Sequence, residues 1–300
     1  MRYVLRIAVL GRFPEIVVDI DRYSRIKQSK AILNHSLSIE EKYEILIQNY
    51  LEFEKGLLNV AANDMIKRPI DYADFFDMKL VFNRLIVNLL TSAKLYVDQL
   101  HRHVRSCLPE DSDALSKTKA LLSEQYDSHP EYRFMEALRN HVQHYGLAVH
   151  NSSSGGKWTS IDEDSFLGYS VKISSLKKYL AEDDDSKKKV LDEIDDTVDL
   201  TLATRGYISS LSIIHGAIRT ITQDSISKAR HELESAIAEY QRVFEKRVIG
   251  LRAMQFDEED KLVEKVPILL DWDDVRLRLC DRNKTLSKLP KWYVTSKSES

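Results

Sequence analysis

A short polar cluster, Arg139 and Asn140 followed by His144, holds the side chains of this chain best suited to chemistry. It lies in the segment "MEALRNHVQHYGL", residues 135–147. A guanidinium is a planar donor that binds phosphate oxygens, and an imidazole, whose ordinary pKa is about 6.5, carries protons near neutral pH. An amide between the two could hold them or contact the phosphate. Together the three side-chain types could bind a phosphodiester and move a proton at it.

A helix from Tyr132 to Val149 is expected to position this cluster, because its apolar residues recur at steps of three and four. On such a helix Asn140 and His144 are neighbours on one ridge, and Arg139 lies on the other side of Asn140. His141 lies at the border of the apolar stripe, where a structural role is expected. The apolar stripe comprises Phe134, Met135, Leu138, Val142, Tyr145 and Val149, and the polar face comprises Arg133, Glu136, Arg139, Asn140, Gln143 and His144.

The segment "RNHVQH" resembles the Arg-polar-x-x-x-His signature of HEPN domains, the helical nucleases of prokaryotes and higher eukaryotes. The longer segment "EYRFMEALRNHVQHYGLAVH" is similar to the corresponding helix of bacterial HEPN proteins. The resemblance covers residues 38–151. It implies a small antiparallel helical bundle that forms a homodimer, in which two copies of the motif face each other across a cleft.

The resemblance also implies a role for each residue. Arg139 would orient and neutralise the scissile phosphate, His144 would be the general acid or base, and Asn140 would hold the pair or contact the phosphate. Arg133 and Gln143, on the same face, would contact the substrate. The implied reaction is attack by the RNA 2'-hydroxyl on its adjacent phosphate, which leaves a cyclic phosphate, needs no metal or other cofactor, and cannot proceed on DNA. The resemblance further implies a role in phage defence or as a toxin, with an antitoxin or regulatory protein as a further partner.

Two other interpretations of the polar face stay open. In the first, a non-catalytic binding or regulatory module uses it to dock a protein or nucleotide, and in the second the motif is incidental. A metal shared by His141 and His144, or by His101 and His103, is disfavoured because no third ligand is close in sequence and the latter pair points to different sides of a helix. The chain has no Gly-rich phosphate loop, paired CxxC, GxSxG or HExxH, so the sequence gives no local support for ATP-driven or zinc chemistry.

The composition limits the class of protein. The 300 residues include 9 Gly and 6 Pro, too few for a turn-rich β-sandwich, and carry a net charge of -3, which excludes binding of nucleic acid through overall positive charge. Any RNA contact must be local. Lys284, Lys288 and Lys291 form a basic region that could contact RNA, although a solvated surface is the favoured interpretation. Two cysteines are too few for a disulfide framework, so we expect free thiols.

The N-terminal apolar run is interrupted by Arg6 and does not predict a signal sequence, and we expect a cytoplasmic protein that does not bind a membrane.

The expected fold class is mainly α, an antiparallel helical bundle of the HEPN type with long accessory helices and a minor β component. The chain order predicts three parts. These are an N-terminal strand or hairpin segment over 1–37, the helical bundle over 38–151, and an accessory, mostly helical region with a disordered tail over 152–300. The first predicted helix begins at a capping box formed by Ser38 and Glu41 and ends at about Lys67, before Pro69. Further helices are predicted over 71–107, over 112–127, from 132 to about 150, and over 198–249. The last of these is either continuous or broken near 222–225.

The segments between these helices carry weaker signals. "NSSSGGKW" predicts a loop, and "FLGYSVKISSLKKYL" predicts a strand followed by a turn of helix. The charge run "AEDDDSKKK" is typical of a solvated surface. The mixture of apolar and charged residues in "VPILLDWDDVRLRLC" does not decide between strand and helix, and "YVTSKSES" is expected to be disordered.

Overall fold

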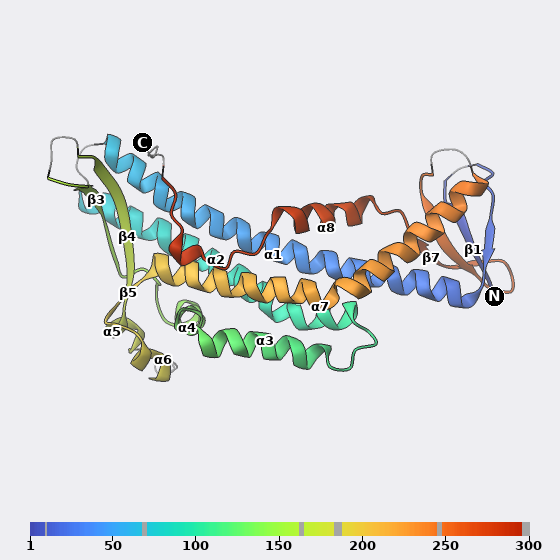
Figure 1. The fold of residues 1–300 in the computed structure, drawn as a ribbon, viewed down its shortest axis with the longest axis horizontal. Coiled ribbons are helices and arrows are strands. Elements are labelled where there is room, and N and C mark those ends of the chain that lie inside the picture. The colour runs from blue at the N-terminus through green and yellow to red at the C-terminus, as the bar shows by residue number, and fades with distance from the viewer. Residues whose placement is uncertain (10, 68–70, 162–164, 183–187, 245–247, 296–300) are drawn as a thin grey trace. The chain divides into compact units, whose positions relative to one another are not determined.

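The computed structural model describes residues 1–9, 11–67, 71–161, 165–182, 188–244 and 248–295. These residues form mostly α-helix with two small antiparallel sheets, so the mainly α class with a minor β component is confirmed (Figure 1). The helices are α1 (Ile20–Ile66), α2 (Tyr72–Cys107), α3 (Ala114–Ser128), α4 (Pro130–His144), α5 (Lys177–Leu180), α6 (Lys188–Glu193), α7 (Leu200–Val243) and α8 (Asp271–Arg282), with a short 3-10 helix at Leu289–Lys291. The strands are β1 (Arg2–Ile7), β2 (Ile16–Val18), β3 (Asn151–Trp158), β4 (Leu167–Leu176), β5 (Thr197–Asp199), β6 (Leu251–Phe256) and β7 (Leu262–Pro267).

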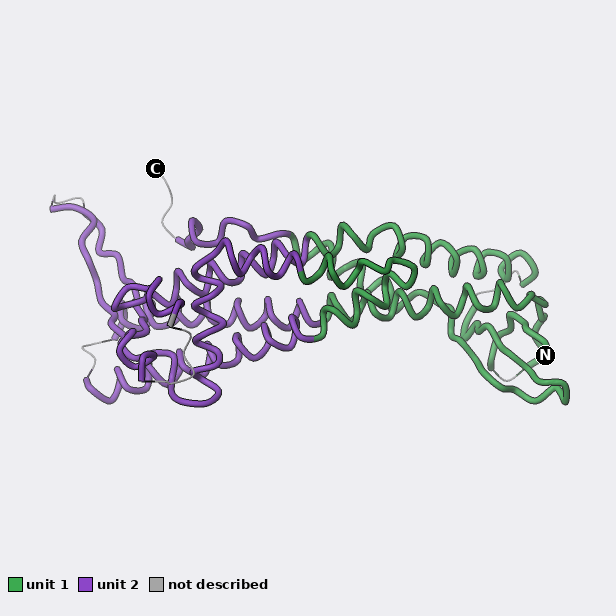
Figure 2. The backbone as a smooth tube through the Cα atoms, turned by 90° about the horizontal axis from the view of Figure 1, so that it is seen from below, with its two compact units in different colours: residues 1–41, 99–119, 217–284 green, residues 42–98, 120–216, 285–300 purple. Residues whose placement is uncertain are grey.

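The chain divides into two compact units (Figure 2). Unit 1 comprises residues 1–41, 99–119 and 217–284, and unit 2 comprises residues 42–98, 120–216 and 285–300. The helices α1, α2, α3 and α7 each contribute residues to both units. The division expected from the sequence follows chain order, whereas each unit is assembled from three separate stretches.

Unit 1 contains a four-stranded sheet with the order β2-β1-β6-β7. The pairing of β1 with β2, antiparallel with Tyr3 opposite Val18, confirms the N-terminal hairpin. Apolar side chains of the sheet and of the first half of α1 and second half of α7 share one core, because each element buries one apolar face. Fully buried members of this core include Leu5, Ile26, Leu33, Leu233, Tyr240 and Leu251.

The prediction that a helix starts at Ser38 is wrong, because α1 begins at Ile20 and runs through that position. The start is set by Asp19, whose side chain accepts the backbone N–H of Arg22 at 2.6 Å. The helix continues past Ser38 because Ile32 and Ile39, both buried, extend the same apolar stripe.

Helix α7 is continuous, so the alternative with a break near 222–225 is wrong. The hydroxyl of Thr222 bonds to the carbonyl of Ile218 at 2.8 Å, which satisfies this polar side chain within the helix. Helix α7 ends at Val243, before the predicted end near Ile249.

Unit 2 is a helical bundle made from parts of α1, α2, α3 and α7 together with α4. Helices α1 and α2 run antiparallel in it: the Tyr43 ring lies 5.7 Å from the Tyr96 ring, and Phe53, later on α1, meets Phe82, earlier on α2, edge-on at 6.4 Å. A Cβ at Gly56 would lie only 2.7 Å from the Leu85 Cδ1 atom, so the two helices approach closely there. The bundle character expected from the sequence is confirmed.

Helix α4 ends at His144, not near His150 as expected, so Tyr145 and Val149 do not extend its apolar stripe. The backbone N–H groups of Tyr145 and Gly146 both donate to the carbonyl of His141, which closes the helix. The chain then turns toward α2, where the amide side chain of Asn83 accepts the N–H of Val149 at 2.9 Å.

The segment "NSSSGGKW" is strand β3, so the loop prediction is wrong. It pairs antiparallel with β4 along its whole length, from Asn151 opposite Ser174 to Trp158 opposite Leu167. Its residues have low intrinsic strand preference, and the backbone ladder to the long strand β4 overrides that preference. The predicted strand and helical turn at β4 and α5 are confirmed.

The unassigned segment 266–280 contributes the end of β7 and most of α8. Helices α2 and α3 lie where the sequence predicts them. Pro69, most of the charge run at 183–187 and the tail at 296–300 lie outside the described residues. In the part of the chain that is described, one helix, α2, is long and apolar enough to span a membrane, and 50% of its most apolar stretch is buried inside the protein.

Candidate functional site

The polar cluster lies on helix α4, whose opposite face packs in the core of unit 2. Pro130 stands in the first turn, where a residue without an N–H is tolerated. Phe134, Met135 and Leu138 are buried and fix the opposite face in the core of unit 2. This packing leaves the polar face of the helix at the surface of the bundle.

The guanidinium of Arg139 is held by side chains of its own helix. It donates to the Asn140 Oδ1 atom at 2.6 Å and to the Gln143 Oε1 atom at 3.2 Å. The Glu136 Oε2 atom lies 3.7 Å from the Arg139 Nε atom, an ion pair too long for a hydrogen bond. The structure therefore brings Arg139, Asn140 and Gln143 together and adds the carboxylate of Glu136, to which the motif assigns no role.

A cavity of about 300 Å³ lies beside this cluster. Arg139, Asn140 and Glu136 line it from α4. His144 is exposed at the end of α4 and is not among the described residues that line the cavity. The opposite walls come from α2 and α3 and include Val97, Leu122, Ser123 and Tyr126.

A buried tyrosine from α7 supports Glu136. The Tyr207 hydroxyl donates to the Glu136 Oε1 atom at 2.6 Å, and the Tyr207 side chain is fully buried. Burial, followed by the charge of Glu136, raises the pKa of Tyr207 well above its ordinary value, so the phenol stays protonated and donates. The spacing of Glu136 three residues before Arg139 was a usable signal for the ion pair, whereas no sequence pattern points to Tyr207.

Arg133 has structural partners and does not line the cavity. It donates to the carbonyls of Tyr126 and Asp127 at 2.7 Å each, and to a Glu193 carboxylate oxygen at 2.7 Å. These bonds tie α4 to the end of α3 and to α6. The expected substrate contact by Arg133 would require it to give up some of these bonds.

The other histidines considered in the sequence lie elsewhere. His141 is buried, with its ring 5.4 Å from that of Tyr145. His103 lies in unit 1, where its Nδ1 atom is 3.0 Å from that of His35. Within the described ranges, no group of three or more His, Cys, Asp or Glu side chains is arranged to hold a metal ion.

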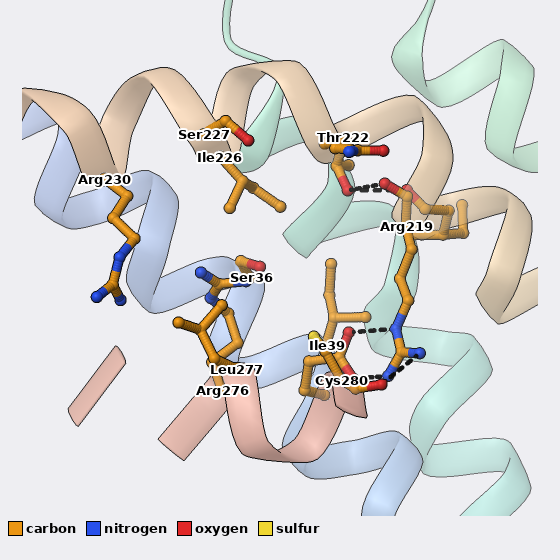
Figure 3. A pocket seen from close by; sticks show the side chains of 13 residues that line it. Ser36, Ile39, Arg219, Thr222, Ile226, Ser227, Arg230, Arg276, Leu277 and Cys280 are labelled. Atoms are coloured by element: carbon orange, nitrogen blue, oxygen red, sulfur yellow. Dashed lines mark hydrogen bonds and ion pairs between the residues drawn. The ribbon is translucent and has the colours of Figure 1, made fainter. Parts of the chain in front are cut away.

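Unit 1 contains a second cavity, of about 320 Å³, between α1, α7 and α8 (Figure 3). From α7, Arg219 binds both carboxylate oxygens of Glu40, at 2.8 and 2.6 Å, and also reaches the carbonyls of Cys280 and Asn283. Because these donors already have acceptors, we interpret Arg219 as a structural residue that links α1 and α7 to α8; the paired charges around it are here named the brace.

A buried carboxylate completes the brace. Asp273 accepts hydrogen bonds from Arg276 at 2.6 and 2.9 Å and from Arg230 at 2.6 Å. Burial acts to raise the pKa of Asp273, but the two guanidiniums outweigh it and lower the pKa below its ordinary value. This cavity is lined by paired charges, which suits it less to binding an anion than the cavity beside Arg139.

Both cysteines are free, as expected from their number. Burial raises the pKa of the Cys107 thiol to about 12 and that of the Cys280 thiol to about 11. They are therefore protonated at neutral pH, and neither is an activated nucleophile.

Comparisons of the chain with protein-family models, with curated proteins and with solved structures found no match.

Proposed function

We propose that this chain is a metal-independent endoribonuclease of the HEPN kind, with Arg139, Asn140 and His144 as its reacting and binding residues. The observation that carries the proposal is the hydrogen-bonded pair of Arg139 and Asn140 at the wall of a cavity, with an exposed histidine one turn further along the same helix. This combination supplies a fixed cation for a phosphate and a nearby group able to carry protons.

The proposed reaction needs only groups of the protein and the RNA. A histidine removes the proton of the 2'-hydroxyl, whose oxygen attacks the adjacent phosphorus. The bond from phosphorus to the 5'-oxygen breaks, and that oxygen takes up a proton. The products are a 2',3'-cyclic phosphate and a 5'-hydroxyl, and Arg139 offsets the charge that gathers on the phosphate oxygens during attack.

The state of Arg139 is consistent with a site that awaits a ligand. Its Nε donor is buried and has no hydrogen-bond acceptor among the described residues. A buried donor without an acceptor is costly, and a phosphate oxygen or a small movement of Glu136 would satisfy it.

A homodimer forms part of the proposal. In one chain His144 does not line the cavity with Arg139, so the proposal requires a second copy to complete the site. Two His144 side chains, one from each copy, would then serve as base and acid. The role in phage defence or as a toxin, and an antitoxin or regulatory partner, follow from the resemblance alone.

The test is cleavage of labelled RNA by the purified protein in EDTA. We expect cleavage that leaves a cyclic phosphate, and a loss of about 100-fold or more in Arg139→Ala and His144→Ala. His231→Ala, which removes an exposed histidine of α7, is the control and should cleave normally. Loss of cleavage on chelation would exclude the metal-free mechanism, and full activity of His144→Ala would exclude histidine from it.

The second candidate is a non-catalytic binding or regulatory module that uses the same polar face. It is favoured by the hydrogen bonds of Arg139 to neighbours on its own helix and by the position of His144 off the cavity. It predicts RNA or protein binding without cleavage under any of the conditions above. Sedimentation together with the cleavage assay separates the candidates, since the ribonuclease proposal also requires a dimer of the 34.7 kDa chain.

A further inference from the structure

A row of aromatic rings follows the end of α4 in unit 2. The ring of Tyr145 lies 5.4 Å from that of His141, His141 lies 6.1 Å from His150, and His150 lies 4.7 Å from Tyr179. The two outer rings are exposed, Tyr145 to 54% and Tyr179 to 38%, whereas His141 is buried. The row thus presents two aromatic surfaces to solvent on either side of a histidine pair.

Positive charges border this row. The Lys178 ammonium lies 4.7 Å from the centre of the Tyr179 ring. The pKa of His150 is lowered to about 4, by burial first and then by the charges of His141, Lys79 and Lys178. Lys79 and Lys178 are cationic at neutral pH, so the local potential at the His150 ring favours an anion.

His150 is a fixed, uncharged donor at neutral pH. Its Nδ1 atom accepts the backbone N–H of Leu176 at 3.0 Å, so the neutral ring carries its proton on Nε2. With its pKa lowered to about 4 the ring does not exchange protons near pH 7, which separates its role from that proposed for His144.

The backbone holds these groups next to the candidate site. The N–H of His150 donates to the carbonyl of Ser174 at 3.0 Å, and the preceding Val149 is bound to Asn83 of α2. Tyr145 directly follows His144 in the chain. A strand of RNA held at His144 would therefore reach these rings with its neighbouring nucleotides.

We propose that Tyr145, His150, Lys178 and Tyr179, here named the aromatic platform, bind single-stranded RNA beside the scissile phosphate. The two exposed tyrosines stack bases, and the Lys178 ammonium and the His150 Nε2–H bind a backbone phosphate. This proposal rests on the proposed ribonuclease function and adds a substrate class to it. Stacking on exposed rings requires unpaired bases, so the platform selects single strands over duplex.

The first test measures binding by the full-length protein with His144→Ala, so that the RNA stays intact. The probe is a fluorescent single-stranded RNA, with a duplex of the same sequence for comparison. We expect Tyr179→Ala to weaken binding of the single strand about 10-fold, Tyr179→Phe to retain it, and the duplex to bind at least about 10-fold more weakly. Lys178→Ala should weaken binding and reduce its salt dependence by about one ion.

The controls are exposed residues of the same types away from the platform. Tyr293→Ala, at a side chain exposed to 77%, and Lys119→Ala should leave the Kd unchanged. Circular dichroism of each variant checks that the fold is retained. Equal binding by wild type, Tyr179→Ala and Lys178→Ala, or no binding of single-stranded RNA at all, would overturn the proposal.

The second test separates the platform from the reaction. In the cleavage assay Tyr179→Ala is expected to raise KM about 10-fold and leave kcat near that of the wild type, because the ring touches a nucleotide and not the reacting atoms. If the wild type does not cleave but binds in a Tyr179-dependent way, the platform stands and the ribonuclease proposal fails. If cleavage depends on His144 but KM is unchanged in both Tyr179→Ala and Lys178→Ala, the ribonuclease proposal stands and the platform is overturned.

Discussion

The Arg139 side chain is fixed by hydrogen bonds to its neighbours and still has one donor available to bind a ligand. Two of its nitrogen atoms donate to Asn140 and Gln143, and the third, Nε, has no hydrogen-bond acceptor within the described ranges. Glu136 balances the charge without forming that third bond. The orientation of the guanidinium toward the cavity therefore depends on the position of Glu136. That position is fixed by the hydrogen bond from the Tyr207 hydroxyl.

The first prediction tests this support. Tyr207→Phe removes the hydroxyl that donates to Glu136 and leaves a partly buried carboxylate short of one partner. We expect the free energy of unfolding, measured by urea denaturation, to fall by about 1.5–3 kcal/mol. Tyr293→Phe, at an exposed ring, should change it by less than about 0.5 kcal/mol. Equal stability of the two variants would mean that the hydroxyl does not support Glu136.

Side-chain chemistry could be predicted from the sequence only where partners are close along the chain. Arg139, Asn140 and Gln143 lie within five residues, and their shared helix face follows from the helical repeat. Tyr207 supports Glu136 from 71 residues away in the chain, and Asn83 binds Val149, beyond the end of α4, from 66 residues away. Such contacts depend on how the helices pack, and no local pattern carries that information.

At the scale of elements, the seat of α4 depends on a close approach to α7. A Cβ built on Gly206 of α7 would lie 2.9 Å from both the Cβ and Cγ atoms of Glu131, in the first turn of α4. Glycine is unfavourable inside a helix, and here its lack of a side chain lets the two backbones come together.

The second prediction follows from this approach. Gly206→Val is expected to push α4 away from α7, to lower the free energy of unfolding by about 1–3 kcal/mol, and to reduce RNA cleavage along with it. Gly155→Val, at a strand position where an added Cβ meets nothing within 4 Å, is the matched control and should stay within about 0.5 kcal/mol of wild type. Thermal denaturation of the two variants and of the wild type measures these differences in stability. A Gly206→Val variant as stable as the wild type would show that α4 and α7 can separate without loss of stability.

The helices themselves were largely predictable, and their ends were less so. Periodic apolar residues located α2 and α3 correctly, because a long amphipathic repeat has few alternative structures. The capping pattern at Ser38 was misleading, since a helix that is already packed passes over a residue able to cap. Strand β3 was missed because its Ser and Gly residues are strand-forming only through pairing with β4.

At the scale of the whole molecule, ion pairs join helices that are far apart in the sequence, as between Arg205 and Glu54 and between Arg219 and Glu40. Asp273 is the clearest case, because it is fully buried and is shared by Arg230 and Arg276. Its pKa is lowered, so its contribution to stability is fully present above the ordinary Asp pKa of about 3.9 and is lost as the pH falls through the folded value.

The third prediction concerns this dependence on pH. Asp273→Asn is expected to lower the free energy of unfolding at pH 7 by about 3–5 kcal/mol, since it leaves two guanidiniums without their shared anion. The difference from wild type should shrink as the pH falls below about 4, because the Asp273 carboxyl of the unfolded chain takes up its proton there, whereas that of the folded protein does so only at a lower pH. Urea denaturation from pH 7 to pH 3 measures it, with Asp281→Asn at an exposed position of α8 as the control. A difference that stays constant over that range would contradict the assignment.

The boundaries between the two units fall inside α1, α2, α3 and α7, with one more beyond α8. Cutting a helix in two leaves several backbone amides and carbonyls at each new end without partners. Neither unit is therefore expected to fold if it is moved alone into another protein. Cutting the chain at any one position would not give two fragments that each fold alone. Over evolutionary time such a chain is expected to be inherited whole and to vary by substitution and by insertions between its helices.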